Sequence, residues 1–252
     1  MDEFAWFMEQ FRLLTGIDLT RYKRPQMERR LTNLRDRRGY RTFPEYIEAL
    51  KLNRALMDEL LDKMTINVSE FFRNPERWTQ LRALLSAMGK SPRVWSAACA
   101  SGEEPYSLAM LLLELGLHQH PILATDIDER VLQRAEEGIY AEPQIRGIDQ
   151  NLLDRYFLRE ADMYRIREQV RKQVQFVKHN LLVDDYPQGL DLIVCRNVLI
   201  YFTDQTKQQI LERFCSALNP GGILFVGSTE QFLGMNLGSL SPVAPFMYQK
   251  AK

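Results

Sequence analysis

The stretch that decides the fold runs from Arg93 to Met110 and reads Arg-Val-Trp-Ser-Ala-Ala-Cys-Ala-Ser-Gly-Glu-Glu-Pro-Tyr-Ser-Leu-Ala-Met. Val94 to Ala98 are mostly small or apolar residues, which is typical of a strand buried on both faces. Cys99 to Gly102 are all small, so the backbone can turn sharply and lie close to a ligand. Glu103-Glu104-Pro105 then begins a helix, with proline and acidic residues in the first turn. Strand, turn and helix together predict a ligand crevice at the carboxyl ends of an open α/β sheet.

The composition of this turn narrows the class of ligand. It lacks the glycine triplet of the dinucleotide fingerprint. Two carboxylates at the turn would also repel a pyrophosphate. We therefore expect a nucleoside that carries a cationic group.

The chain after residue 93 alternates between strands and helices. Strands are expected at 93–98, 121–126, 190–195, 222–227 and near 245–250, and helices at 104–115, 128–136 and 204–217. This alternation predicts βαβ units and a mostly parallel sheet. Residues 140–180 interrupt it. Because Met163–Arg167 and Val174–Lys178 alternate apolar and charged residues, we expect two half-exposed strands in a small antiparallel insertion.

Residues 1–90 have the periodicity of helices throughout. Apolar residues recur at intervals of three and four in the first helix, at Phe4, Phe7, Met8, Phe11 and Leu14. Further helices are expected at 25–38, from 43 to about 50, at 55–64 and at 75–88. The predicted organisation is an all-helical domain (1–75) followed by an α/β domain (76–252) with a β insertion at about 140–180.

Composition excludes several classes of protein. Hydrophobic content of 45% is ordinary for a soluble domain, and the zero net charge gives no global attraction to nucleic acid or membrane. The three cysteines have no paired or metal-like spacing, and the first residues lack the pattern of a signal peptide. No apolar run approaches the roughly 20 residues that a membrane span requires. A cytoplasmic, monomeric protein is expected.

Asp126 ends the second expected strand in the sequence Ala-Thr-Asp-Ile-Asp. A carboxylate at this position can accept both hydroxyls of a ribose. The alternative is an N-cap for the following helix, but Asp128 suits that position better. We therefore expect Asp126 to bind a ribose.

The segment Asn67–Arg73 alternates polar and apolar residues and ends with an arginine after two phenylalanines. Arg73 is either a solvated surface residue or a cation that orients a carboxylate through its planar guanidinium. The residues alone leave both interpretations open.

A third polar cluster follows the apolar strand at 190–195. Arg196 and Asn197 fall at its carboxyl end, where ligands bind, and Tyr201 follows four residues later. A core tyrosine with a surface hydroxyl is the alternative for Tyr201. The three histidines, His118, His120 and His179, have no spacing typical of a metal site and are expected at the surface.

A local excess of positive charge lies at residues 21–41. Nine basic residues stand against only Glu28 and Asp36: Arg21, Lys23, Arg24, Arg29, Arg30, Arg35, Arg37, Arg38 and Arg41. A solvated helix face is the simplest interpretation, but the excess favours an acidic partner surface. No aromatic residues are interleaved as a stacking platform, so nucleic acid is not expected.

These motifs resemble the chemotaxis receptor methyltransferases, the CheR family, over nearly the whole chain. The most specific segments are Asn67–Arg73, Trp95–Ser107, Ala124–Asp128 and Cys195–Phe202. The turn Leu218–Gly222 is similar to one found in many class I methyltransferases and is less specific. Four motifs in the right order make a chance resemblance improbable.

The resemblance implies S-adenosylmethionine as methyl donor and glutamate side chains of chemoreceptor cytoplasmic helices as acceptors. It implies cofactor contacts by Asn67, Ser69, Arg73, Glu104, Asp126, Asn180, Leu181, Arg196 and Asn197. Ser69 stands where threonine is frequent in the family, but the hydroxyl is retained. Arg73 and Tyr201 are expected at the reaction centre, where they would orient the acceptor carboxylate. Because a glutamate is already ionised at neutral pH, no general base is required.

The resemblance also bears on partners. The basic segment 21–41 would dock on acidic receptor helices. The loop around Arg159 to Tyr164 is shorter than in members that capture the carboxyl-terminal pentapeptide of a receptor by strand addition, so no such capture is expected.

Three alternatives to this function remain. The first is a class I methyltransferase that acts on a small molecule or on another protein. The second is a non-catalytic adaptor that senses S-adenosylmethionine. A nicotinamide oxidoreductase is the third, and the missing glycine triplet disfavours it.

Overall fold

The computed structural model describes residues 2–64, 69–230, 232 and 234–252. The chain divides into two compact units, which are described separately. The helical unit comprises residues 1–67 and 201–207, and the α/β unit comprises residues 68–200 and 208–252. No described helix has both the length and the apolar character needed to cross a membrane.

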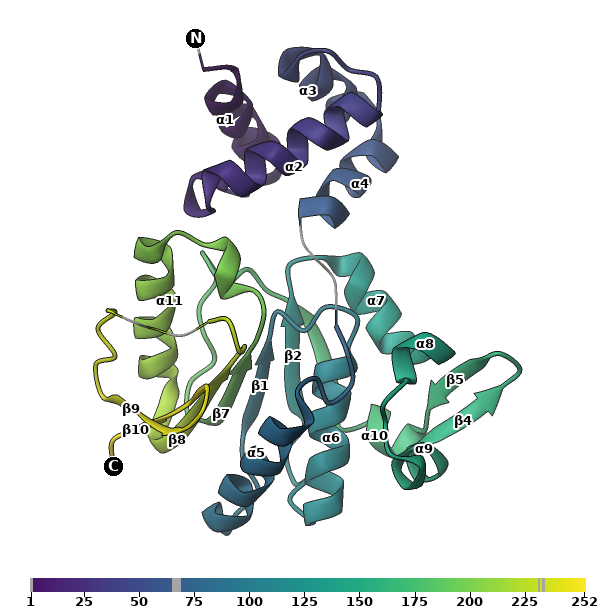
Figure 1. The fold of residues 1–252 in the computed structure, drawn as a ribbon, viewed down its shortest axis with the longest axis vertical. Helices are drawn as coiled ribbons and strands as arrows, with labels where there is room; N and C mark the ends of the chain where they lie inside the picture. The colour runs from purple at the N-terminus through teal and green to yellow at the C-terminus, as the bar shows by residue number, and fades with distance from the viewer. Residues whose placement is uncertain (1, 65–68, 231, 233) are drawn as a thin grey trace. The chain divides into compact units, whose positions relative to one another are not determined.

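The helical unit contains α1 (Glu3–Thr15), a short 3-10 helix η1 (Leu19–Arg21), α2 (Arg24–Arg37), α3 (Phe43–Leu52) and α4 (Arg54–Met64) (Figure 1). Asp2 caps α1, and Thr42 with Glu45 forms a capping box at α3. Aromatic rings join α1 to α3, with the Phe7 and Phe43 ring centroids 4.6 Å apart. The helices expected in this region are confirmed.

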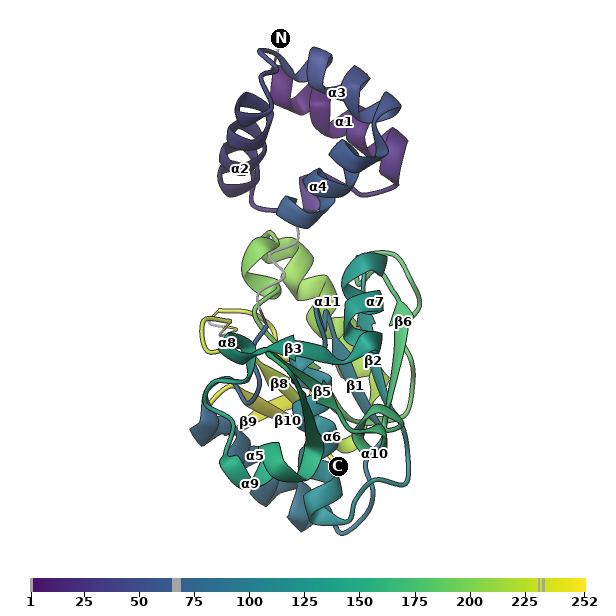
Figure 2. The ribbon, with the colours of Figure 1, turned by 90° about the vertical axis from the view of Figure 1, so that its right-hand side faces the viewer.

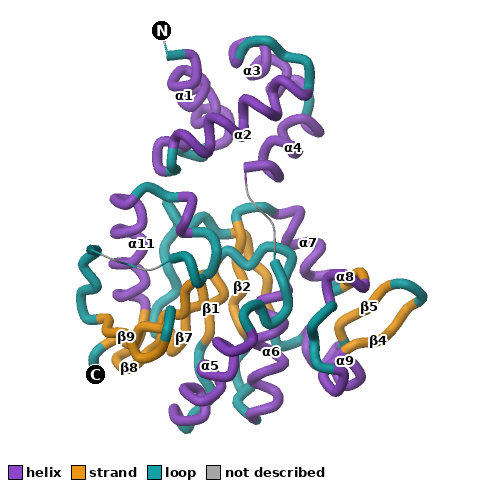
Figure 3. Tube along the Cα trace, in the orientation of Figure 1, coloured by secondary structure: helices purple, strands orange, loops and turns teal. Residues whose placement is uncertain are grey.

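The main sheet of the α/β unit has seven strands. They are β1 (Val94–Ala97), β2 (Ile122–Asp126), β6 (Val174–Lys178), β7 (Leu190–Cys195), β8 (Leu218–Val226), β9 (Leu240–Ala244) and β10 (Met247–Lys250). Their order is β6-β2-β1-β7-β8-β10-β9. Figure 3 shows the neighbouring strands β7, β1 and β2 at the middle of the sheet. The five strands β6, β2, β1, β7 and β8 run parallel to one another, whereas β10 is antiparallel to both β8 and β9. The expected mostly parallel sheet is confirmed, and β9 is a strand that the sequence pattern did not indicate.

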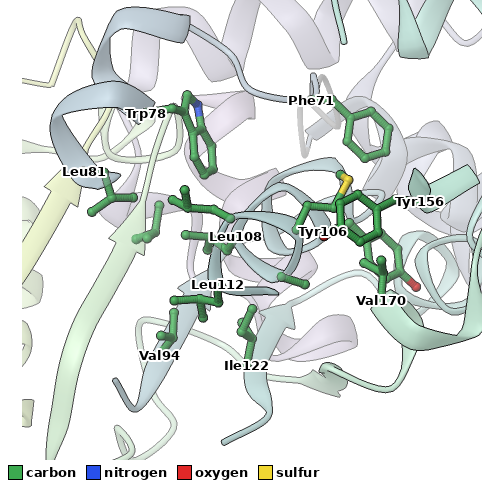
Figure 4. Packing of buried hydrophobic residues seen from close by; sticks show 14 of the residues in the cluster. Phe71, Trp78, Leu81, Val94, Tyr106, Leu108, Leu112, Ile122, Tyr156 and Val170 are labelled. Carbon is green, nitrogen blue, oxygen red and sulfur yellow. The ribbon is translucent and has the colours of Figure 1, made fainter. Parts of the chain in front are cut away.

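Helices cover both faces of the sheet, because successive strand residues point to opposite sides. On one face, Val94 and neighbouring strand residues pack against α5 (Pro75–Met88) and α6 (Glu103–Leu115), where Trp78 and Leu108 contribute (Figure 4). On the other face, Trp95 packs edge-on against Phe214 of α11 (Asp204–Ala217). Helix α7 (Glu129–Glu137) covers the same sheet through Leu132.

A small antiparallel sheet is inserted after α7 (Figure 2). It consists of β3 (Ile139–Ala141), β4 (Phe157–Glu160) and β5 (Met163–Ile166), in the order β3-β5-β4, accompanied by α8 (Glu142–Ile145), α9 (Gln150–Tyr156) and α10 (Glu168–Arg171). The expected antiparallel insertion is therefore present at β5. The assignment of Val174–Lys178 to it was wrong, because β6 pairs in parallel with β2 at the edge of the main sheet. An edge strand exposes one face, so it shows the same alternating pattern as a strand of a small sheet.

The division of the chain also differs from the expected boundary after residue 75. The α/β unit begins at residue 68, and Phe71 belongs to its core; Trp78, Leu81 and Leu85 of α5 lie in that core on the expected side of the boundary. Residues 201–207 group instead with the helical unit, where Thr203 donates its amide to the Arg21 carbonyl. This segment is remote in sequence, so local patterns give no indication of the grouping.

Candidate functional site

Polar side chains gather where β1, β2, β7 and β8 end, a region called here the carboxyl edge. Asp126 is the last residue of β2 and is 7% exposed. Its two carboxylate oxygens accept the amides of Ala100 (2.9 Å) and Asp128 (3.0 Å). Each oxygen retains a lone pair for a ligand. Burial raises the pKa of Asp126, so a ligand that donates hydrogen bonds would stabilise its charged form.

The turn after β1 brings the backbone beside this carboxylate. Ala98 and Ala100 have φ values of 62° and 47°, in the left-handed region that L residues rarely adopt. Gly102 has a φ of 93°, and a Cβ there would lie 2.8 Å from the Ala135 Cβ. Asp128 is the N-cap of α7 and accepts the amide of Arg130, as the sequence predicted.

Glu104 places a second buried carboxylate at the carboxyl edge. One oxygen accepts the Ser96 hydroxyl (2.8 Å), and the other lies 3.8 Å from a guanidinium nitrogen of Arg196. Burial raises the pKa of Glu104 to about 7, although the Arg196 charge and the Ser96 hydrogen bond oppose the change. A cationic ligand group beside Glu104 would restore its full negative charge.

Arg73 lies in a segment with a strained backbone. Its neighbours Phe72 and Asn74 have φ values of 48° and 62°. The Phe72 amide donates to the Ser107 hydroxyl at 3.0 Å, and the Trp78 indole donates to the Arg73 carbonyl, also at 3.0 Å. Such strain persists where surrounding contacts determine the conformation, and it concentrates at functional sites. The guanidinium of Arg73 is half-buried and makes no hydrogen bond or ion pair within the described ranges.

Arg196 supplies further contacts to the same segment. Its side chain is 3% exposed, and one terminal nitrogen donates to the Arg73 carbonyl and to the Asn74 side chain, each at 2.8 Å. The guanidinium also lies 4.7 Å from the Phe225 ring centroid. Its Nε is buried without a partner among the described groups. The side chain therefore holds the backbone of Arg73, and the cofactor contact predicted for Arg196 stays a prediction.

Asn197 follows Arg196 with a φ of 64°, and its amide donates to Glu230 at 2.7 Å. Sequence reasoning missed Glu230, which is 5% exposed and accepts three backbone amides. The available signal was its position in Gly-Ser-Thr-Glu, directly after the last parallel strand.

Two further expected site residues follow the edge strand of the main sheet. Asn180 and Leu181 follow β6, where Asn180 accepts the Leu182 amide and the Leu181 carbonyl accepts the Tyr186 hydroxyl. Strand β6 lies beside β2, and the His179 amide donates to the Asp126 carbonyl. His179 is half-buried against Trp95 rather than at the surface, whereas His118 and His120 are exposed as expected.

Three further expected residues are Asn67, Ser69 and Tyr201. Asn67 falls outside the described residues, and Ser69 is half-buried. Tyr201 belongs to the helical unit, where its carbonyl accepts the Lys23 amide and Arg30 lies 5.5 Å from its ring centroid. Among the residues that the structure describes, no three acidic, histidine or cysteine side chains form a metal site.

The carboxyl edge suits a nucleoside with a cationic group. Asp126 and Glu104 are buried carboxylates with raised pKa values and unused lone pairs, so hydrogen-bond donors and positive charge would stabilise both. Neither a P-loop nor a dinucleotide glycine triplet occurs in the sequence. The sheet order, its antiparallel last pair and these acidic strand ends define a class I S-adenosylmethionine-dependent methyltransferase.

Comparison with known proteins identifies the family. Residues 67–240 match the model of the CheR methyltransferase, SAM binding domain, and residues 2–65 match the CheR methyltransferase, all-alpha domain. The chain belongs to the CheR methyltransferase family, and S-adenosylmethionine is its cofactor.

Relatives cover nearly the same length. The chemotaxis protein methyltransferase of Listeria monocytogenes is 42% identical over 255 residues, which span 98% of this chain and 97% of that protein. The chemotaxis protein methyltransferase of Borreliella burgdorferi is 35% identical over 93% of this chain and 89% of its own. That of Escherichia coli is 36% identical over 86% of this chain and 80% of its own.

Proposed function

We propose that this protein methylates glutamate side chains on the cytoplasmic helices of bacterial chemoreceptors, forming the glutamate methyl esters used in chemotaxis adaptation. The observation that carries the proposal is the pair of buried carboxylates, Glu104 and Asp126, at the carboxyl edge of a chain whose relatives are named chemotaxis protein methyltransferases. It would act in the cytoplasm as a monomer.

The chemistry requires positioning more than acid or base. S-adenosylmethionine supplies a methyl group bound to a sulfonium sulfur. A carboxylate oxygen of the acceptor forms a bond to the methyl carbon, and the C–S bond breaks with its electron pair remaining on sulfur. No proton is transferred, because the acceptor glutamate is already ionised at neutral pH. Holding the reacting groups in line can be equivalent to about 10⁵–10⁸ M effective concentration.

The residues divide into those that hold the cofactor and those that hold the acceptor. Asp126 would accept the ribose hydroxyls, and Glu104 would face the cationic part. Further cofactor contacts are proposed for Asn67, Ser69, Arg73, Asn180, Leu181, Arg196 and Asn197. Arg73 and Tyr201 would orient the acceptor carboxylate, and the lack of an ion pair at Arg73 within the described ranges supports this role.

The basic segment 21–41 would bind the acidic receptor helix, and ion pairs within the helical unit narrow the docking face. Arg24 pairs with Asp2 and Glu28, Arg35 with Asp36, and Arg38 with Glu59. Arg29 and Arg37 make no ion pair with the described residues. Both are exposed and lie outside the α2 stripe that carries buried Met27 and Leu31. The exposed surface that carries these two arginines is the proposed docking face.

The small sheet is not proposed as a receptor tether site. Strands β4 and β5 are joined only by Ala161 and Asp162, with Ala161 at a φ of 54°. So short a hairpin supports the view that no carboxyl-terminal pentapeptide is captured.

The proposed reaction is tested with S-adenosylmethionine labelled in its methyl group and the cytoplasmic fragment of a chemoreceptor from the same organism. We expect label to enter the receptor and to be released as methanol by mild alkali, which distinguishes a carboxylate ester from N-methylation. Arg73→Ala should lower the rate of methyl transfer at least 10³-fold. Normal turnover in Arg73→Ala with unchanged S-adenosylhomocysteine binding would exclude its role.

The docking face is tested by charge reversal. The double variant Arg29→Glu, Arg37→Glu should raise the KM for the receptor fragment about tenfold or more, with kcat and S-adenosylhomocysteine affinity unchanged. Arg38→Gln is the matched control, because Arg38 is already paired with Glu59. Wild-type activity should also fall steeply with salt. Equal effects of both variants, or activity independent of salt, would count against this face.

A further inference from the structure

Glu230 is a buried carboxylate that interacts with backbone amides rather than with a side-chain cation. One oxygen accepts the amides of Asn197 (2.7 Å) and Gly227 (2.8 Å), and the other accepts the amide of Ile200 at 3.3 Å. No ion pair to Glu230 is found among the described residues. Three amide donors from two chain segments therefore stabilise one negative charge that is only 5% exposed.

These bonds connect the ends of two neighbouring parallel strands. Gly227 directly follows β8, and Asn197 is the second residue after β7, with a left-handed φ of 64°. The packing leaves no room for a side chain at Gly227, where a Cβ would lie 2.5 Å from the Glu230 carboxylate and 2.9 Å from the Asn197 amide. The conformation of residues 197–200 is thus determined from outside by Glu230.

We propose that Glu230 is a positioning residue that fixes the loop 197–200 in the conformation needed to bind the cofactor. The inference rests on the proposed function, in which Asn197 contacts S-adenosylmethionine. Glu230 is proposed to hold the loop and not to contact the cofactor, because three backbone amides from two strand ends converge on its carboxylate, against two amides for Asp126. Its effect would reach the ligand through the strained backbone of Asn197.

The distribution of the three bonds predicts a graded series of variants. Glu230→Gln can keep its amide oxygen on the Asn197 and Gly227 amides, but its NH₂ group would then face the Ile200 amide, donor against donor. Glu230→Ala leaves the Asn197 and Gly227 amides buried without an acceptor, which is the costlier change. We therefore expect cofactor affinity to decrease in the order wild type, Glu230→Gln, Glu230→Ala.

Asp191 offers a matched control on the same sheet. It is also 5% exposed, accepts a backbone amide from Arg93, and is the second residue of β7, at the end opposite to the carboxyl edge. Asp191→Asn should reduce thermal stability without changing the loop 197–200. It separates a general loss of stability from a specific effect on the site.

The experiment measures S-adenosylhomocysteine affinity by calorimetry, together with hydrogen exchange at the amides of Asn197 and Ile200. In Glu230→Ala we expect affinity to fall at least tenfold and both amides to exchange at least tenfold faster. Asp191→Asn should bind within twofold of wild type. In Glu230→Gln, the Ile200 amide should exchange faster than the Asn197 amide.

Each outcome bears on a different claim. Wild-type affinity in Glu230→Ala, or an equal loss in Asp191→Asn, would overturn the positioning role alone. Failure of the wild-type protein to bind S-adenosylhomocysteine would overturn the proposed function instead. If Glu230→Ala does not fold, Glu230→Gln decides: unchanged affinity with unchanged Ile200 exchange refutes the inference.

Discussion

At the amino end of β7, the Asp191 carboxylate accepts three hydrogen bonds, whereas Asp126 and Glu104 at the carboxyl edge accept two and one from the described residues. Asp191 accepts the Lys90 ammonium, the Arg93 amide and the Asn219 side chain. Burial favours a higher pKa for Asp191, but these three donors together hold the pKa below its ordinary value.

The carboxyl edge shows the opposite balance. Burial raises the pKa values of Glu104, Asp126 and Glu230, and the hydrogen bonds available within the protein do not reverse the change. The guanidinium of Arg196 is also destabilised by burial, which lowers its pKa. At Asp191 the donors of the fold outweigh the effect of burial, whereas Glu104 and Asp126 keep lone pairs and an incompletely stabilised charge that a ligand would satisfy.

Of the variants that compare the carboxyl edge with the amino end of β7, Asp126→Ala should have the largest effect, and that effect should be on cofactor affinity. Asp126→Ala removes two charge-assisted hydrogen bonds to a ribose, each about 1.5–3 kcal/mol, so S-adenosylhomocysteine should bind about 10²–10⁴-fold more weakly. Calorimetric titration measures the change. An affinity within threefold of wild type, in a variant shown to be folded, would remove Asp126 from the site.

A smaller effect is expected on the stability of the cofactor-free protein through Glu104. Its folded pKa of about 7 exceeds its ordinary value of 4.5, so the native state binds more protons between these values. Wild-type stability should therefore rise as pH falls from 8 towards 5, whereas Glu104→Gln should be more stable than wild type at pH 8, by about 3 kcal/mol at most. Denaturant titrations at several pH values test this. If Glu104→Gln were less stable than wild type at pH 8, the charged form of Glu104 would not destabilise the folded state.

The amino end should respond in the opposite direction. Asp191→Asn is expected to lower the free energy of unfolding at pH 7 by about 1–3 kcal/mol, because the amide cannot satisfy the same donors. The folded pKa of Asp191 lies below the ordinary value of 3.8, so its contribution is present above that pH and is lost as pH falls through the folded value. The difference between variant and wild type should therefore narrow in acid. A constant difference from pH 7 to pH 3 would contradict the assignment.

Lys90→Met should have the smallest effect. The Lys90 side chain is 60% exposed, so its 2.7 Å ion pair with Asp191 is screened and should contribute about 0.2–1 kcal/mol. When the same denaturant titration is repeated at high salt, most of the difference in free energy of unfolding between Lys90→Met and wild type should disappear. A loss as large as that in Asp191→Asn would mean that the ammonium, rather than the amides, holds this carboxylate.

The strand, turn and helix at residues 93–110 could be predicted from the local sequence, because each of these elements depends on residues that are neighbours in the chain. Small residues predicted the turn before Glu103, and a carboxylate at a strand end placed Asp126 at the carboxyl edge. The sheet to which Val174–Lys178 belongs could not be predicted in this way. Alternation of apolar and charged residues indicates that one face of a strand is exposed, but it does not indicate which strand is its partner.

The residues that hold the site were the least predictable. Arg196 was placed correctly at the end of β7, but its partners Arg73 and Asn74 lie more than 120 residues away, as sequence separations of 123 and 122 record. Glu230 resembles any loop glutamate until the strand ends that it joins are brought together. Patterns within one segment therefore indicate residues that face a ligand more readily than residues that face other parts of the chain.

Trp78 gives the strained segment an optical reporter. The protein has three tryptophans, of which Trp95 is fully buried in the sheet and Trp6 lies in α1 of the helical unit. Trp78 donates its indole N–H to the Arg73 carbonyl and packs edge-on against Phe72. Indole emission is sensitive to that hydrogen bond, so a chain with Trp78 as its single fluorophore would signal whether Arg73 keeps its backbone conformation as ligands arrive.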